Sequence, residues 1–221
     1  LAPEPSFSIV PMIAATAAVS LLAVVMALPV GLGCAFLLSF CVSEKPAKTA
    51  LAFIDMLAGV PSVIFGFVGL AVLVKWMEKT LDMATGESVL AGGILLAVML
   101  LPYFVTGCYE TIEKGKELYG NASLSLGVSS WYTMRHVILP QAVRNILPAM
   151  CNEFVTIIKE TSILGMVGIV ELMFRAQSIA KQTYLFLEPY VIAAIMYFII
   201  VFPLSKIIAA VERRMSKSVT R

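Results

Sequence analysis

The chain has 221 residues, of which 60% are hydrophobic and 14% are charged, and its mean hydropathy is +0.93. Soluble domains of this length are less apolar, so we expect an integral membrane protein. The formal net charge of +2 gives no reason to expect a nucleic-acid partner. The four cysteines are far apart in apolar runs, without metal or redox spacing, and are interpreted as packing residues.

The apolar segments predict an all-α polytopic protein with about five transmembrane helices. Segments close to the length of about 20 residues that spans a bilayer cover 9–41, 51–76, 89–108, 142–158 and 189–211. Residues 163–174 are too short to cross alone and predict a re-entrant or interfacial piece, while 43–48, 78–88 and 175–188 are predicted as polar loops. The chain begins at Leu1 without methionine, which is consistent with either a removed signal peptide or a lost first helix.

The second segment has an unusual interior, GVPSVIFG over 59–66. Pro61 removes a helical hydrogen bond and clashes with the preceding turn, and the flanking glycines permit a neighbouring backbone to approach closely. We therefore expect a kink at Pro61 and Ser62. The kink either lines a pathway or serves packing alone.

The most polar long run of the chain covers 118–150 and lies between apolar segments. Residues 121–126 suit a helix, Gly127 supplies a conformation that stops it, and Ser129 with the following serine can cap the next turn. Trp131 begins an amphipathic patch, and Pro140 suits the first turn of the next helix. The run predicts a helix–turn–helix outside the membrane, or alternatively an ordinary interfacial loop.

Lysine and arginine favour one side of the predicted spans. That side holds Lys45, Lys48, Lys114, Lys116, Arg135, Arg144, Arg213, Arg214, Lys217 and Arg221. The other side holds Lys75, Lys79, Arg175 and Lys181, partly offset by Glu78, Asp82, Glu87 and Glu188. The positive-inside rule places the central loop and the C-terminus in the cytoplasm and the N-terminus outside.

The spacing within the polar run resembles the EAA loop of ABC importer membrane subunits, which docks into the ATPase subunit. Ala122 stands five residues before Gly127, and Gly127 stands thirteen before Pro140. Asn121 occupies the place of the usual acidic residue. The resemblance implies a cytoplasmic coupling loop over 109–140 within a single permease domain, 1–221. The residues that it assigns to the ATPase contact are Asn121, Ala122, Ser123, Gly127, Trp131 and Pro140.

Nearly the whole chain resembles type I ABC importer permeases, but its two halves resemble different branches. The GVPSVIFG run is similar to permeases of phosphate uptake systems. The second half, with VILPQAVRNILPAMCNEFVTIIKETSILGMVGIVEL and the ERR tail, is similar to permeases for polar amino acids. The resemblance implies phosphate as the first expected solute and a polar amino acid as the alternative. A membrane scaffold that transports nothing is an alternative of another class.

Charged and hydroxyl residues end the fourth predicted span. Ionisable groups there are costly and tend to face a cavity or a partner. Lys159 and Glu160 could instead neutralise each other as a structural pair. The candidate translocation-pathway residues are Pro61, Ser62, Lys159, Glu160, Thr161 and Ser162.

No phosphate-binding glycine loop with Lys and Ser/Thr is present, and the single histidine belongs to no Cys/His cluster, so we expect no enzyme activity, metal or cofactor in this chain. The resemblance implies that ATP and Mg²⁺ bind to separate ATPase subunits. It also implies a second permease subunit, identical or homologous, and an extracytoplasmic solute-binding protein. The expected location is the plasma membrane of a prokaryote, the inner membrane in a Gram-negative cell.

Overall fold

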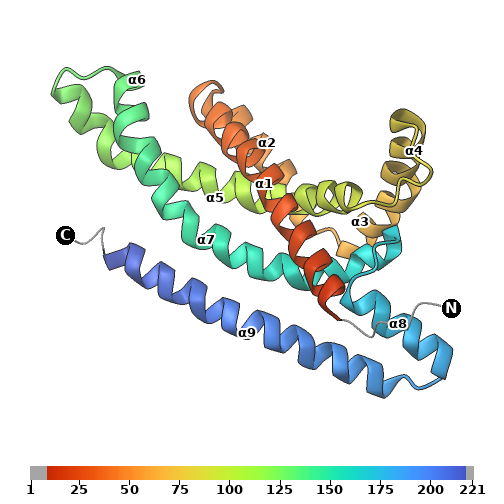
Figure 1. Cartoon of the computed structure of the whole chain (residues 1–221). Helices are drawn as coiled ribbons and strands as arrows, with labels where there is room; N and C mark the ends of the chain where they lie inside the picture. The colour runs from red at the N-terminus through yellow and green to blue at the C-terminus, as the bar shows by residue number, and fades with distance from the viewer. Residues whose placement is uncertain (1–8, 218–221) are drawn as a thin grey trace.

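The computed structural model describes residues 9–217, and every regular element in that range is helical (Figure 1). Leu1 and Arg221 lie outside the described residues. The α-helices are α1 (Val10–Phe40), α2 (Glu44–Ala58), α3 (Ser62–Val68), α4 (Lys75–Leu81), α5 (Val89–Ser125), α6 (Ser130–Thr133), α7 (Leu139–Glu160), α8 (Leu172–Thr183) and α9 (Leu187–Lys217). Two π-helical segments, η1 (Gly69–Val74) and η2 (Met134–Ile138), and the 3-10 helix η3 (Thr161–Val167) join them. The predicted all-α class is confirmed.

The predicted spans differ in how well they suit a membrane. Among the described residues, α1, α5 and α9 are long and apolar enough to cross, and the bent pair of α2 with residues 62–81 makes a fourth if it counts as one span. Helix α7 has 22 residues, which is long enough, but its charged and amide residues make it more polar than these helices. Helix α7 is therefore as long as the predicted fourth span requires, but it is less apolar than a typical membrane span.

The second predicted span is broken at Pro61. Helix α2 ends at Ala58, α3 begins at Ser62, and the axis of α2 differs by 89° from that of the segment 62–81. Pro61 has φ −55° and ψ 135°, outside the helical region, and its ring nitrogen has no proton to donate. The expected kink is confirmed in the stronger form of a complete break.

The predicted polar loop over 43–48 is wrong in extent, because α2 already begins at Glu44. Ser43 is extended and precedes the first turn, and Lys48 Nζ lies 2.6 Å from Glu44 Oε1, one turn back on the same face. A local i, i+4 pair thus supports helix where the charged composition indicated a loop.

Helix α1 packs along α5 through small residues. Val19, Ala23 and Ala27 are almost fully buried. A Cβ added to Gly31 would lie 2.7 Å from Phe104 Cβ, so glycine permits the close approach of the two helices at this point. This pair forms the centre of the hydrophobic core, and α7 packs against both helices.

Helices α5, α6 and α7 form a hairpin that projects at one end of the molecule (Figure 1). Gly127 ends the first arm with φ +73°, Ser129 Oγ accepts a hydrogen bond of 3.3 Å from Tyr132 N, and Pro140 stands in the first turn of α7. The predicted helix–turn–helix is confirmed. Its first arm is not a separate helix, however, because α5 continues without interruption to Ser125.

The segment predicted as a re-entrant piece and a polar loop is largely helical. After η3, Gly168 adopts φ +76°, and α8 then covers Leu172–Thr183, where we expected a loop over 175–188. The N-cap of α8 is Glu171, which is completely buried. Glutamate is not among the residues that favour this position, so the sequence gives no signal for the start of α8. Helix α9 runs along one edge of the molecule, packed on α7 and α8 (Figure 1).

Candidate functional site

A cavity of about 170 Å³ lies beside the break between α2 and α3 and reaches α5 and α7. We call it the carboxylate cavity. Its lining residues are Leu57, Ala58, Val60, Ser62, Phe65, Met99, Leu100, Tyr103, Glu153, Thr156, Ile157 and Glu160.

The polar groups of the carboxylate cavity come from one face of α7, from the start of α3 and from Tyr103 on α5. Glu153, Thr156 and Glu160 are spaced three and four residues apart, which places them on one side of a helix. Ser62 reaches the cavity from α3, which packs against η3, the segment that follows α7. The packing is close, because a Cβ added to Gly66 of α3 would lie 2.8 Å from Ile163 Cγ1 of η3. The helix break and the end of α7 are thereby brought together.

Neither cavity glutamate has an ion-pair partner among residues 9–217. Ser62, Thr156 and Tyr103 add hydroxyl groups to the lining. Two carboxylates beside hydroxyl groups favour a cationic or hydrogen-bonding solute and disfavour an anion. The positive charge of Lys159 acts on Glu153 from beyond ion-pair distance and offsets part of this charge.

The predicted pathway residues do not all line the same cavity. Ser62 and Glu160 line the carboxylate cavity, and Pro61 is exposed at the break. Lys159 and Ser162 line a second cavity, of about 460 Å³, with Met173, Tyr190, Ala193, Ala194 and Tyr197.

Thr161 lines neither cavity and is fully buried, with its hydroxyl donating to Ile158 O at 2.7 Å. Successive helical residues point about 100° apart, so neighbours in sequence face different cavities. The alternative that Lys159 and Glu160 neutralise each other is not supported, because they line separate cavities and form no ion pair in the described part of the chain.

Two acidic residues were missed by sequence reasoning. Glu153 carried a detectable signal, since it stands seven residues before Glu160 and therefore on the same helical face. Glu171 carried none. Its carboxylate accepts hydrogen bonds from Met173 N at 2.8 Å and Phe174 N at 2.5 Å, and Tyr197 Oη donates to it at 2.8 Å. This contact ties the start of α8 to α9.

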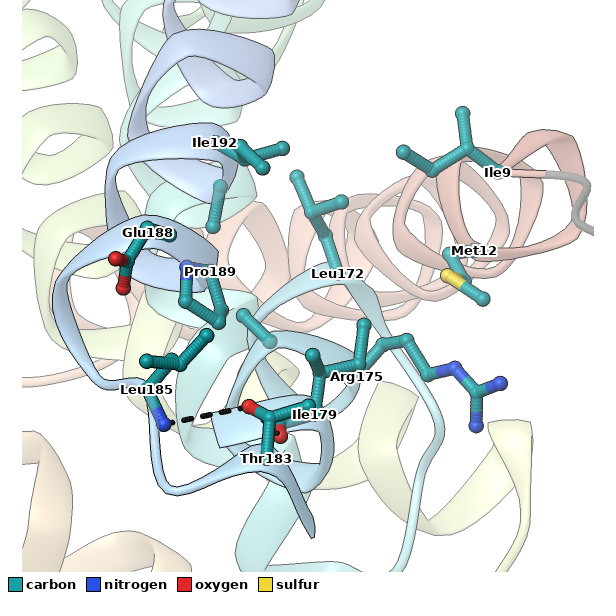
Figure 2. Close-up of a pocket in the computed structure, with 12 residues that line it drawn as sticks. Ile9, Met12, Leu172, Arg175, Ile179, Thr183, Leu185, Glu188, Pro189 and Ile192 are labelled. Carbon is teal, nitrogen blue, oxygen red and sulfur yellow. Dashed lines mark hydrogen bonds between the residues drawn. The ribbon is translucent and has the colours of Figure 1, made fainter. Parts of the chain in front are cut away.

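A third cavity, of about 240 Å³, lies between the start of α1, α8 and the start of α9 (Figure 2). Its lining is almost entirely apolar, with Leu172, Ile179 and Ile192 among the residues drawn. The guanidinium group of Arg175 extends away from the centre of the group in Figure 2. Since no predicted pathway residue lines this cavity, it does not belong to the candidate site.

The tip of the hairpin exposes large apolar side chains. Leu126 is 82% exposed and Trp131 is 62% exposed, while Tyr132 stacks on His136 with ring centroids 4.1 Å apart. The predicted contact residues Asn121, Ala122, Gly127, Trp131 and Pro140 are exposed, and Ser123 is half-buried. Apolar groups exposed at a polar hairpin are typical of a protein-binding surface.

Helices that suit a membrane, a broken helix beside a polar cavity and an exposed hairpin at one end are features of transporter membrane subunits. Residues 27–217 match the model of the family described as binding-protein-dependent transport system inner membrane component. The chain belongs to this family, and its resemblance to type I ABC importer permeases is confirmed.

Individual relatives are similar over different lengths. The chain is 31% identical over 147 residues to the probable ABC transporter permease protein YqgH of Bacillus subtilis, which covers 66% of this chain and 48% of that protein. It is 33% identical over 167 residues to the glutamine transport system permease protein GlnP of Escherichia coli K12, covering 75% of this chain and 74% of that protein. With the arginine transport system permease protein ArtQ of Bacillus subtilis it shares 38% identity over 109 residues, 49% of this chain and 48% of that protein. The chain thus spans about half the length of two of these relatives.

Solved structures agree with the fold. A chain of the amino acid ABC transporter crystallised with histidines is 31% identical, with a TM-score of 0.74 and coverage of 90% of both chains. A chain of the methionine transporter MetNI in an inward-facing conformation has a TM-score of 0.69, covering 96% of this chain and 99% of that chain. At 19% identity the second likeness concerns the fold alone.

Proposed function

We propose that this chain is the membrane subunit of an ATP-driven importer for a polar amino acid, and that the solute passes the carboxylate cavity. The observation that carries the proposal is the pairing of Glu153 and Glu160 with hydroxyl groups at the helix break. Every amino acid carries an ammonium group at neutral pH, and two carboxylates attract it. The hydroxyl groups of Ser62 and Tyr103 offer hydrogen bonds to the remaining polar groups of the solute.

The same charges count against phosphate, the first solute expected from the sequence. A unit negative charge about 6 Å from one carboxylate is repelled by about 3 kcal/mol at an effective dielectric constant of 20. Two carboxylates roughly double that cost, and the charge of Lys159, which forms no direct ion pair with them, offsets only part of it. The names of the relatives also favour the alternative, since they include glutamine and arginine permeases. The phosphate expectation is therefore replaced by the polar amino acid.

The family and the exposed hairpin support the remaining parts of the proposal. ATP is hydrolysed on separate ATPase subunits, which bind the tip around Leu126 and Trp131. A second permease subunit completes the pathway, and an extracytoplasmic binding protein delivers the solute. The excess of lysine and arginine on the hairpin side of the spans supports an orientation with the hairpin in the cytoplasm.

The test is solute uptake by the complex reconstituted in liposomes with its ATPase and binding protein. Uptake and ATPase stimulation are compared for a panel of polar amino acids and for phosphate. We expect at least one amino acid, and not phosphate, to stimulate both activities. Stimulation by phosphate alone would overturn the solute assignment. If no solute-loaded binding protein changed the ATPase activity, the result would favour the non-transporting scaffold.

Charge-removing variants locate the path. Glu153→Gln and Glu160→Gln are each expected to lower uptake about tenfold or more, with the solute-independent ATPase activity retained. Glu44→Gln is the matched control, because Glu44 is exposed at the start of α2 and does not line the carboxylate cavity. Equal uptake by all three variants would place the path elsewhere.

A further inference from the structure

A fourth cavity, of about 560 Å³, lies between α5 and α7 at the base of the hairpin. We call it the basic cavity. Its lining residues are Thr111, Lys114, Gly115, Leu118, Tyr119, Ile138, Gln141, Ala142, Arg144 and Asn145. It shares no lining residue with the carboxylate cavity.

The charge of the basic cavity is positive and comes from both arms of the hairpin. Lys114 belongs to α5 and Arg144 to α7, and no acidic residue is part of the lining. Lys114 Nζ lies 3.8 Å from Glu110 Oε2, but both side chains are exposed, which makes this a weak contact. Arg144 forms no ion pair with any residue in the described range 9–217. Two cations on facing helices thus lack a strong anionic partner.

The other polar groups of the cavity suit an oxyanion. Gln141 and Asn145 carry amide donors, and Thr111 and Tyr119 carry hydroxyl groups. Guanidinium and ammonium groups surrounded by neutral donors are the usual surroundings of a phosphate group.

The position of the cavity along the helices indicates where that phosphate comes from. Lys114 stands six residues beyond Cys108, where the apolar part of α5 ends, which corresponds to about 9 Å along a helix. Arg144 lines the same cavity from α7, so its side chain lies at a similar depth. The polar headgroups extend about 5 to 7 Å beyond the hydrocarbon on each side of a bilayer. The backbone of Lys114 therefore lies just outside this layer, and its long side chain can reach back to the headgroups.

We propose that the basic cavity binds the phosphate group of an anionic phospholipid in the leaflet on the hairpin side. The lipid phosphate bridges Lys114 and Arg144 and so holds the two arms at a fixed separation. Because the arms continue into the hairpin tip, the bound lipid sets the position of the tip.

The test measures lipid binding by the complete permease complex. The complex is equilibrated with equal amounts of phosphatidylglycerol and phosphatidylcholine, and the lipids retained are counted by native mass spectrometry. Each cation beside an anionic headgroup raises affinity about fivefold. We therefore expect Lys114→Gln and Arg144→Gln each to lower phosphatidylglycerol retention about fivefold, with the double variant lower still.

The matched control removes the same charge elsewhere. Lys75→Gln with Lys79→Gln takes two exposed cations from α4, which is not part of the cavity, and is expected to change retention less than twofold. The exchange Lys114→Arg with Arg144→Lys keeps the charge and is expected to preserve the preference. Equal losses in the cavity pair and the control pair would overturn the proposal, because they would reflect general attraction to an anionic surface.

Two further arms distinguish other occupants. Inorganic phosphate at millimolar concentration is added to the complex in a neutral detergent, and binding of this ion with no preference for phosphatidylglycerol would overturn the lipid assignment. The purified permease is also compared with and without its ATPase. Loss of phosphatidylglycerol on adding the ATPase would show that the cavity receives the partner protein, which would equally overturn the proposal.

Discussion

Replacing Tyr197 by phenylalanine tests whether the buried contact with Glu171 holds α9 against the start of α8. The tyrosine hydroxyl donates a hydrogen bond of 2.8 Å to a carboxylate that is completely buried. The carboxylate keeps its two backbone donors, Met173 N and Phe174 N, so the variant loses one of three hydrogen bonds.

The size of the effect follows from the charge and burial of the acceptor. Hydrogen bonds to charged groups contribute about 1.5 to 3 kcal/mol in proteins, whereas side-chain bonds inside membrane proteins average about 0.6 kcal/mol. We expect about 1 to 2 kcal/mol for Tyr197→Phe. In a chain of this size each kcal/mol lowers Tm by about 2 to 4 °C, so the expected decrease is about 2 to 8 °C.

The assay is thermal unfolding of the purified permease in detergent, with Tyr190→Phe as the control. Tyr190 lies on the same helix, lines the same cavity as Tyr197, and its hydroxyl has no hydrogen-bond partner among the described residues. A double-mutant cycle with Glu171→Gln isolates the pairwise contribution, for which we expect at least about 0.5 kcal/mol. A Tm decrease no larger than that of Tyr190→Phe, or a coupling near zero, would refute the reasoning.

Glycine substitutions give predictions of opposite sign. Gly31→Ala places a methyl group 2.7 Å from Phe104 Cβ and is expected to cost about 1 to 3 kcal/mol, read as a lower Tm. Gly33→Ala, on the same helix with nothing within 4 Å, is expected to raise stability by about 0.5 to 1 kcal/mol, and a lower Tm for both would contradict the packing explanation. Gly127→Ala forces an L-residue to φ +73° and is expected to cost about 1 kcal/mol and to weaken ATPase binding, measured by co-purification. Gly120→Ala, within α5, leaves the turn unchanged, so equal loss of binding in both variants would show that the turn conformation is not the cause.

The features that sequence reasoning recovered are those with local causes. A run of apolar residues about 20 long predicts a membrane helix because the bilayer requires it. Proline at 61 breaks a helix because of its own ring, and glycine at 127 accepts a positive φ because it has no Cβ. The structure agrees at Pro61 and Gly127, and the candidate spans among the described residues match the predicted ones except for 142–158.

The candidate site was recovered only in part, since its residues meet through packing. Ser62 and Glu160 were both predicted and do line one cavity, but Lys159 and Ser162 face another. Glu153 could have been predicted from helical spacing alone, because it lies on the same helix face as Glu160, two turns earlier.

By itself, the sequence determined the membrane class, the approximate spans, the break at Pro61 and the turn at Gly127, because hydropathy, proline and glycine act within a few residues of the chain. The tertiary structure decided the rest. It buried Glu171 beneath Tyr197, extended α5 to Ser125, and placed Lys114 and Arg144 on facing walls of one cavity. These outcomes depend on how helices distant in sequence pack, and the surroundings of a charge are set by that packing rather than by its neighbours along the chain.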